Sequence, residues 1–394
     1  MTILILYCLV FCGFWIVGMY YEYVTLRRMP VLSNTTPELP PNKNDWPMVS
    51  IIVPACNEAR HIESAIKSRL ALDYPNLEII AINDRSTDHT GKILDSLAKE
   101  DHRLKVIHID SLPDGWLGKV HALHQGVKQA SGQWYLFTDA DVYFKPSVLH
   151  QAIAYVFQQQ VNHLVCIPEV RTRGFWLNVA IRTFFLAFCI KARLATVNND
   201  NSKAAAGVGA FNLVEADLFH RTPGFEWLRM EPVDDYGLGV MLKQAGSRTH
   251  MLNAMSEITV PWYETLHEMF QGVEKNSFGP GANYSWLRLI MMALLITASA
   301  LAPIITLAAG LVTHNTILLG IFILFIATLL FFARVNYHEG NGGVWAYLCL
   351  PAGFFLLETM LLRSAWLCSR NYGIDWRGTH YTEGQLKAGQ RVRF

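Results

Sequence analysis

Long apolar segments near both ends constrain the fold of this chain more than any other feature. Residues 3–21 carry no charged side chain and are about long enough to cross a bilayer as one helix. Residues 289–312 and 317–332 form a second apolar pair, separated by the short polar segment 313–316. Inside lipid, every backbone polar group must find a partner within the protein, which favours helices. The sequence therefore predicts an N-terminal transmembrane anchor and, further along, a transmembrane helical hairpin.

Basic residues after the first apolar segment set its predicted orientation. Arg27 and Arg28 follow that segment, which lacks the basic start and the small-residue cleavage site of a signal peptide. By the positive-inside rule, its C-terminal end faces the cytoplasm. We predict a protein of the plasma (inner) membrane whose residues 29–285, which contain no comparable apolar run, form a cytoplasmic domain. The alternative for residues 3–21 is a buried core helix.

A third apolar stretch, residues 344–368, is interrupted by polar and helix-breaking side chains. Glu358 and Arg363 are unfavourable on a lipid-facing surface, and a crossing here would place the basic tail outside the cell. We predict a re-entrant or interfacial segment, with a fourth span as the alternative. The predicted domains are an anchor (1–28), a cytoplasmic domain (29–285), a transmembrane hairpin (286–334), and a membrane-embedded or interfacial segment with a cytoplasmic tail (335–394).

Charge and cysteine content exclude two classes of function. The net charge is +1, and no Lys/Arg cluster is large enough to neutralise a nucleic-acid backbone, so we expect no nucleic-acid partner. The seven cysteines are scattered and form no C-x-x-C pair, which argues against a disulfide framework or a zinc site.

Strand and helix patterns alternate through the first part of the cytoplasmic domain. This alternation predicts right-handed βαβ units and therefore an α/β, Rossmann-like domain with a mostly parallel sheet. Ligands of such sheets bind beyond the carboxyl ends of the strands. The predicted strands are 49–53, 77–82, 106–109 and 134–138, and the predicted helices are 60–71, 88–99 and 119–130.

Two aspartates follow the last of these strands. Asp139 and Asp141 lie two positions apart, so their side chains lean to one side of the chain. Two neighbouring carboxylates repel each other and need a positive partner or water. Their hard oxygen atoms suit Mg²⁺ or Mn²⁺, which would take oxygen atoms of a diphosphate as further ligands. The alternative is a solvated loop or a helix cap.

Other polar motifs follow the same sheet edge. The stretches VSIIVPACNEA (49–59) and INDRSTD (82–88) end the first and second strands. In DGWLGKVHALHQG (114–126), Lys119 begins a predicted helix, and a helix N-terminus with a lysine favours a phosphate. By itself, Lys119 could equally be a solvated first-turn lysine.

The order of these motifs over residues 48–250 resembles the family 2 inverting glycosyltransferases of the GT-A fold. The resemblance implies a nucleotide-sugar donor, a UDP-sugar by analogy with the family, and a divalent cation as cofactor. By this resemblance, Asp84 binds the nucleobase, and the turn with Pro54, Asn57 and Glu58 lines the nucleobase and the ribose. Asp139 and Asp141 would hold the ribose, the diphosphate and the metal, with Asp141 the more direct metal ligand.

The same resemblance implies a catalytic base further along the chain. EPVDDYGLGVMLKQAG (231–246) matches the family's acidic motif ahead of a Leu-Gly helix, with Asp-Asp in place of Glu-Asp. Asp235 would be the base and Asp234 its neighbour; the alternative role is N-capping. Upstream, Gly209 in GVGAFNLVEADLF (207–219) would let the backbone approach a sugar or acceptor closely, or would simply pack a strand.

Two short stretches favour a lipid acceptor. The Gln-x-x-Arg-Trp motif of processive family members is absent from the sequence, whereas QGVEKN (271–276) and WRGTHY (376–381) are similar to a membrane-bound subgroup that includes hopanoid- and carotenoid-associated enzymes. Trp376, Arg377 and Tyr381 would then lie near the site, or would anchor the chain at the interface. Residues 175–194, aromatic and basic, predict an interfacial helix, with a core helix as the alternative.

These expectations define a metal-dependent inverting glycosyltransferase. It would move a sugar from a nucleotide-sugar to a lipid acceptor at the cytoplasmic membrane face. The alternatives are a processive polysaccharide synthase and a catalytically silent nucleotide-sugar-binding membrane protein. A transporter is a weaker alternative, because two or three membrane helices are few for a pore.

Overall fold

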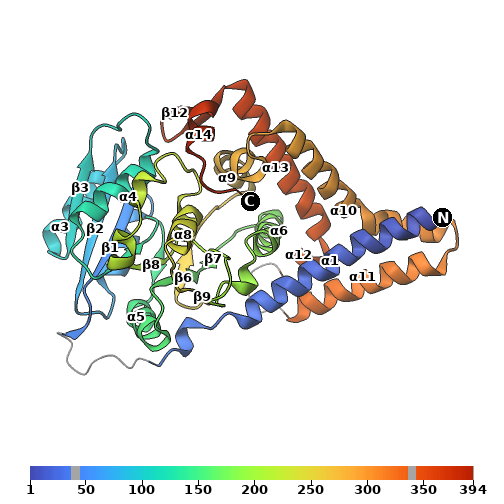
Figure 1. The fold of residues 1–394 in the computed structure, drawn as a ribbon, viewed down its shortest axis with the longest axis horizontal. Helices are drawn as coiled ribbons and strands as arrows, with labels where there is room; N and C mark the ends of the chain where they lie inside the picture. The colour runs from blue at the N-terminus through green and yellow to red at the C-terminus, as the bar shows by residue number, and fades with distance from the viewer. Residues whose placement is uncertain (37–44, 336–342, 394) are drawn as a thin grey trace.

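A computed structural model describes residues 1–36, 45–335 and 343–393. The remaining residues, which belong to the predicted cytoplasmic domain and to the predicted last segment, lie outside the described part of the chain. The centre of the fold is a seven-stranded sheet in the order β3-β2-β1-β4-β8-β6-β9 (Figure 1). Its strands are β1 (Val49–Ala55), β2 (Leu77–Asp84), β3 (Leu104–Ile109), β4 (Trp134–Phe137), β6 (His163–Ile167), β8 (Asn212–Glu215) and β9 (Thr249–Asn253).

The sheet is mostly parallel and buried on both faces. Only β8 runs antiparallel to its neighbours β4 and β6. Along β1, Ile51 and Val53 pack into the core on one face while Ile52 packs into the core on the other. A strand that is apolar on both faces is typical of a parallel sheet covered by helices. The predicted α/β class and the four predicted strands are confirmed, with boundaries shifted by a few residues.

Helices cover both faces of this sheet. One face is covered by α2 (Ile62–Leu70), α3 (Thr90–Glu100) and α5 (Val148–Gln159), and the other by α4 (Gly118–Gln129), α7 (Ala216–His220) and α8 (Asp234–Gln244). The chain order reverses between β1 and β4, because β2 and β3 lie on one side of β1 and β4 on the other. At such a switch point, the loops beyond the carboxyl ends of the strands diverge and leave room for a ligand.

Among the residues that the structure describes, three helices are long and apolar enough to cross a membrane. They are α1 (Thr2–Arg28), α10 (Trp286–Val312) and α11 (Thr316–Val335), which pack together beside the sheet domain (Figure 1). The shorter α12 (Gly343–Leu348) leads into α13 (Leu350–Arg370), which is not one of these three. Between the sheet domain and the three apolar helices lie α6 (Phe175–Lys191) and α9 (Leu266–Ala282), both in contact with α13 (Figure 1).

The C-terminal segment returns to the sheet domain. A hairpin of β11 (Gly373–Trp376) and β12 (Thr379–Thr382) is followed by α14 (Glu383–Gly389), whose start is closed by a capping box between Thr382 and Gln385. A small three-stranded sheet of β5 (Tyr143–Phe144), β7 (Glu169–Val170) and β10 (Ile258–Val260) completes the fold. Because the tail contacts the sheet domain, both lie on the same side of any membrane that the apolar helices cross.

Candidate active site

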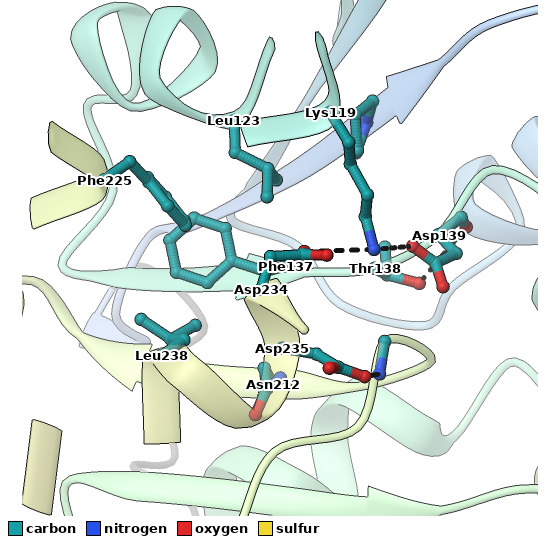
Figure 2. A pocket seen from close by; sticks show the side chains of 12 residues that line it. Lys119, Leu123, Phe137, Thr138, Asp139, Asn212, Phe225, Asp234, Asp235 and Leu238 are labelled. Carbon is teal, nitrogen blue, oxygen red and sulfur yellow. Dashed lines mark hydrogen bonds and ion pairs between the residues drawn. The ribbon is translucent and has the colours of Figure 1, made fainter. Parts of the chain in front are cut away.

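A lysine between two carboxylates marks the centre of the site. Lys119, in the first turn of α4, places its Nζ atom 2.8 Å from Asp139 Oδ1 and 3.1 Å from Asp234 Oδ2 (Figure 2). Asp139 lies two residues after the end of β4, and Asp234 begins α8. The charges of these carboxylates raise the pKa of Lys119 although its partial burial opposes this, so the ammonium stays charged.

Asp235 is held by two backbone donors. Its Oδ2 accepts a hydrogen bond from the N–H of Gly209 at 2.9 Å, and its Oδ1 accepts one from the N–H of Tyr236 at 2.7 Å. Burial and the neighbouring charge of Asp234 raise the pKa of Asp235, while the charge of Lys119 opposes the increase. The result is a fixed carboxylate that is more basic than an ordinary aspartate, which suits a general base.

Gly209 has a steric reason to be glycine. Its carbonyl oxygen accepts the N–H of Asp139 at 2.8 Å, so the two loops run in direct contact. A Cβ atom at Gly209 would collide with the Asp139 carboxylate. The loop with Gly209 therefore joins Asp139 on one side to Asp235 on the other, and its close approach to a sugar or acceptor stays a prediction.

The chemistry of Asp139 and Asp141 fits a divalent cation. Burial, followed by the charges of Asp139 and Glu58, raises the pKa of Asp141 to about 7. A cation beside these oxygen atoms would restore the ionised form. Within the part of the chain that the structure describes, no group of three or more His, Cys, Asp or Glu side chains is arranged to hold a metal. Asp139 and Asp141 would therefore share the ion with oxygen atoms of a donor diphosphate or of water.

Asp84 ends β2 beside the start of α4. Its side chain is buried, and Arg85 donates to both of its oxygen atoms, from Nε at 2.8 Å and from Nη2 at 3.0 Å. Gly118 packs so closely that a Cβ atom there would collide with Asp84 and Arg85. Asp84 thus lies next to the helix turn that carries Lys119, in the place where the resemblance predicts a nucleobase.

The turn after β1 adjoins the turn after β2. Asn57 Oδ1 accepts the N–H of Thr87 at 2.8 Å, and its backbone adopts the left-handed region with φ of 58°. Pro54 lines the small pocket that also contains Lys119 and Asp139. The structure therefore brings the predicted residues of both turns to one edge of the sheet.

Two of the three predicted tail residues lie at this edge. Arg377 Nη2 is 3.0 Å from Glu58 Oε1, and the Tyr381 hydroxyl accepts the N–H of Gly118 at 3.3 Å. Trp376 instead lines a second pocket between α9, α13 and β11, which contains none of the aspartates named above. Its predicted place near the reaction centre stays a prediction.

Three residues that support the site were not predicted from the sequence. Arg85 holds Asp84, and Glu231 accepts backbone N–H groups ahead of α8. Arg69 in α2 is fully buried and donates to the carbonyl oxygens of Asp139 at 2.6 Å and Val142 at 3.0 Å. The only available signal for Arg69 was a charged residue on the apolar face of a predicted helix.

Comparisons with known proteins give a family for part of the chain. Residues 50–222 match the family model described as Glycosyl transferase family 2. The chain is similar to 4,4'-diaponeurosporenoate glycosyltransferase of Staphylococcus aureus, with 22% identity over 338 residues that cover 85% of this chain and 88% of that protein. An uncharacterized glycosyltransferase of Haemophilus influenzae is 38% identical over 110 residues, which cover 28% of this chain and 33% of that protein.

A solved structure similar to this chain is the mannosyltransferase PcManGT from Pyrobaculum calidifontis in complex with GDP-Man and Mn²⁺. It has 17% sequence identity and a TM-score of 0.49, and the match covers 91% of this chain and 99% of that one. The family model confirms the family resemblance, and the mostly parallel sheet confirms the predicted α/β class. Residues 50–222 form a glycosyl transferase family 2 domain, and the chain is a glycosyltransferase.

Proposed function

We propose that this glycosyltransferase moves a sugar, with inversion, from a nucleotide-sugar to an apolar lipid acceptor at the cytoplasmic face of the inner membrane. One observation carries the proposal. Asp139, Lys119, Asp234 and Asp235 meet where β4, α4 and α8 converge, with Asp235 fixed by Gly209. Such a site has one set of groups for a diphosphate and a separate carboxylate for an acceptor proton. A UDP-sugar is the proposed donor.

The residues divide the reaction between them. The acceptor oxygen attacks the anomeric carbon, the bond from that carbon to the diphosphate oxygen breaks, and the nucleoside diphosphate departs. Asp235 takes the acceptor proton as the new glycosidic bond forms. Lys119 offers a positive charge to the departing phosphate once the donor displaces a carboxylate from its ammonium. A divalent cation on Asp139 and Asp141 would supply further charge neutralisation for the leaving group.

A row of aromatic rings supports an apolar acceptor. Trp262 is 37% exposed and stacks on Tyr263 with ring centroids 4.8 Å apart. Trp262 also contacts Phe184 of α6, which stacks on Phe188, and Phe188 contacts Tyr236, the neighbour of Asp235. The name of the Staphylococcus relative designates a carotenoid carboxylate as its acceptor. By analogy, the proposed acceptor has a long hydrocarbon chain, which aromatic rings favour.

The contacts of the C-terminal segment with the sheet domain support the proposed membrane topology. If α1, α10 and α11 cross the bilayer, the tail on the sheet domain requires α13 to stay on the cytoplasmic side, since a further crossing would separate the two. The re-entrant or interfacial placement of residues 344–368 is therefore our preferred arrangement. The length of α6 and its exposed Phe175 and Trp176 also suit the proposed interfacial position.

The proposed reaction is tested by turnover of the purified protein in detergent with UDP-sugars, GDP-sugars and a membrane lipid extract. We expect a UDP-sugar to be consumed, a lipid bearing one or a few sugars to appear by mass spectrometry, and activity to be lost with EDTA and regained with Mn²⁺ or Mg²⁺. A polymeric product would indicate a polysaccharide synthase instead. Binding of the nucleotide-sugar without turnover of any lipid would indicate a silent binding protein.

Removing an aromatic ring tests the acceptor side. Trp262→Ala is expected to raise the KM for the lipid acceptor by about three- to tenfold, since aromatic contacts are worth about 0.5–1.5 kcal/mol each. The KM for the donor should not change. Trp366→Ala is a matched control, because Trp366 on α13 is also exposed, at 51%, and contacts Arg370 rather than the aromatic row. An unchanged acceptor KM in the Trp262 variant would argue against contact between the lipid acceptor and these aromatic rings.

A further inference from the structure

A buried glutamate connects the start of α8 to the C-terminal segment. Glu231 is fully buried just ahead of Asp234 in the sequence. Its Oε2 accepts hydrogen bonds from the backbone N–H of Arg391 at 2.7 Å and of Val392 at 2.8 Å. Its Oε1 accepts the N–H of Val233 at 3.1 Å. Hydrogen bonds from backbone N–H groups to a carboxylate are strong, so this junction is well fixed.

The junction bears directly on the first turn of α8. Val233 is the N-cap residue of α8, and its carbonyl oxygen accepts the N–H of Gly237 at 2.8 Å. A Cβ atom at Gly237 would lie 3.3 Å from Cγ of Glu231 and 3.6 Å from Cγ2 of Val392. The tail, Glu231 and the turn that carries Asp235 are therefore packed as one unit.

The tail itself is held by other parts of the fold. Gln390 Nε2 donates to the carbonyl oxygen of Gly279 at 3.0 Å and to Asn283 Oδ1 at 3.1 Å, at the junction of α9 and α10. Val392 is 1% exposed and belongs to the same apolar cluster as Tyr236. Residues 390–392 are thus a fixed support, and Glu231 transmits their position to α8.

We propose that Glu231 is a positioning residue for the transfer reaction, which holds the start of α8 against residues 391 and 392 so that Asp235 stays in line with Gly209 and the acceptor. This inference rests on the proposed role of Asp235 as the base. Glu231 acts through the backbone, since its carboxylate is consumed by three N–H groups and faces no substrate. A displacement of a catalytic group by about 1 Å costs on the order of 10²-fold in rate.

The direct test is Glu231→Gln. The amide keeps the size of the side chain, but its NH₂ group must face a backbone N–H, so one contact becomes repulsive. We expect kcat to fall by about 10- to 100-fold, while the Kd for UDP stays near that of the unmodified protein. Glu78→Gln is the matched control: Glu78 is also buried and also accepts a backbone N–H, from Ser131 at 2.8 Å, but lies at the opposite end of β2. It should lose stability without losing kcat.

A double-mutant cycle separates positioning from general damage. If Glu231 acts only through Asp235, then Glu231→Gln should lower kcat little further in an Asp235→Asn background, because the base is already lost. If Glu231 is merely structural, the two losses should multiply. Full additivity of the two effects, or a wild-type kcat in the folded Glu231→Gln protein, would overturn the inference.

A second variant covers the case in which Glu231→Gln does not fold. Arg391→Pro removes one donor N–H and leaves Glu231 in place, and Gln390 already has the extended backbone (φ −62°, ψ 124°) that a following proline needs. It should reproduce the loss of kcat with intact UDP binding, and a normal kcat would contradict the role. If Asp235→Asn proves fully active, the proposed base is wrong. If Asp235→Asn is inactive while Glu231→Gln and Arg391→Pro are both fully active, the proposed function stands and this inference fails.

Discussion

Replacing Asp235 with asparagine is expected to lower kcat by about 10²- to 10⁴-fold, the usual contribution of a general base. Asparagine is nearly isosteric, and its oxygen can still accept the N–H of Gly209 while its NH₂ group faces the N–H of Tyr236, but its amide cannot take a proton from the acceptor. The Kd for the nucleotide should therefore change little. Initial rates with labelled donor and an equilibrium titration of UDP measure the two quantities separately.

A surface aspartate provides the control for this variant. Asp200 pairs with Arg248 on the surface, and its change to asparagine is expected to leave kcat unaltered. The pH profile adds a second readout. Because burial and Asp234 raise the pKa of Asp235, and only the ionised form accepts a proton, kcat should fall with decreasing pH already above the normal range of an aspartate. An Asp235→Asn protein with normal turnover would remove this residue from the mechanism.

Replacing Arg69 with methionine is expected to lower both stability and activity. Arg69 is fully buried and donates to the carbonyl oxygens of Asp139 and Val142, and its guanidinium lies over the ring of Phe144. Loss of the guanidinium removes this donor from the carbonyl group of the buried Val142 and leaves that of Asp139 with the hydroxyl of Thr138 at 3.5 Å, at a cost of about 2–5 kcal/mol in the free energy of unfolding. The loop with Asp139 and Asp141 then loses its fixed position, so metal and donor binding should weaken as well.

Denaturation in detergent and a titration with Mn²⁺ and UDP measure these two losses. Arg103→Met is the control, because Arg103 also donates to a backbone carbonyl, that of Leu70 at 2.8 Å, but lies just before β3 and away from the loop with Asp139. It should cost some stability and leave Mn²⁺ and UDP binding unchanged. An Arg69→Met protein that binds Mn²⁺ and UDP normally would show that the loop does not depend on this side chain.

The sheet and its carboxylates were predictable because their signals are local. Apolar runs that alternate with helical spacing predicted β1 to β4, and the rule that ligands bind beyond the strands predicted one edge for Asp84 and Asp139. The resemblance added Asp235, whose role no local pattern could distinguish from a helix cap. The three apolar helices followed from length and hydrophobicity alone.

The contacts that hold the site in place were not predictable, because they join residues far apart in the chain. Glu231 and Val392 are separated by 161 positions, and nothing near either residue indicates the other. For a buried charge such as Arg69, the sequence shows only a charged residue on an apolar helix face, and only the folded loop shows which carbonyl groups it satisfies.

The contact between Glu58 and Arg377 joins positions 319 residues apart in the chain, and it has a consequence for how the molecule assembles. The sheet forms from earlier parts of the chain than the tail, which follows α10 and α11. If α10 and α11 cross a bilayer as proposed, the tail can reach the sheet only after this pair has inserted, so that folding and insertion are coupled in a fixed order. A chain in which this insertion fails would have a complete sheet domain without the contact between Arg377 and Glu58 that attaches the C-terminal segment to it.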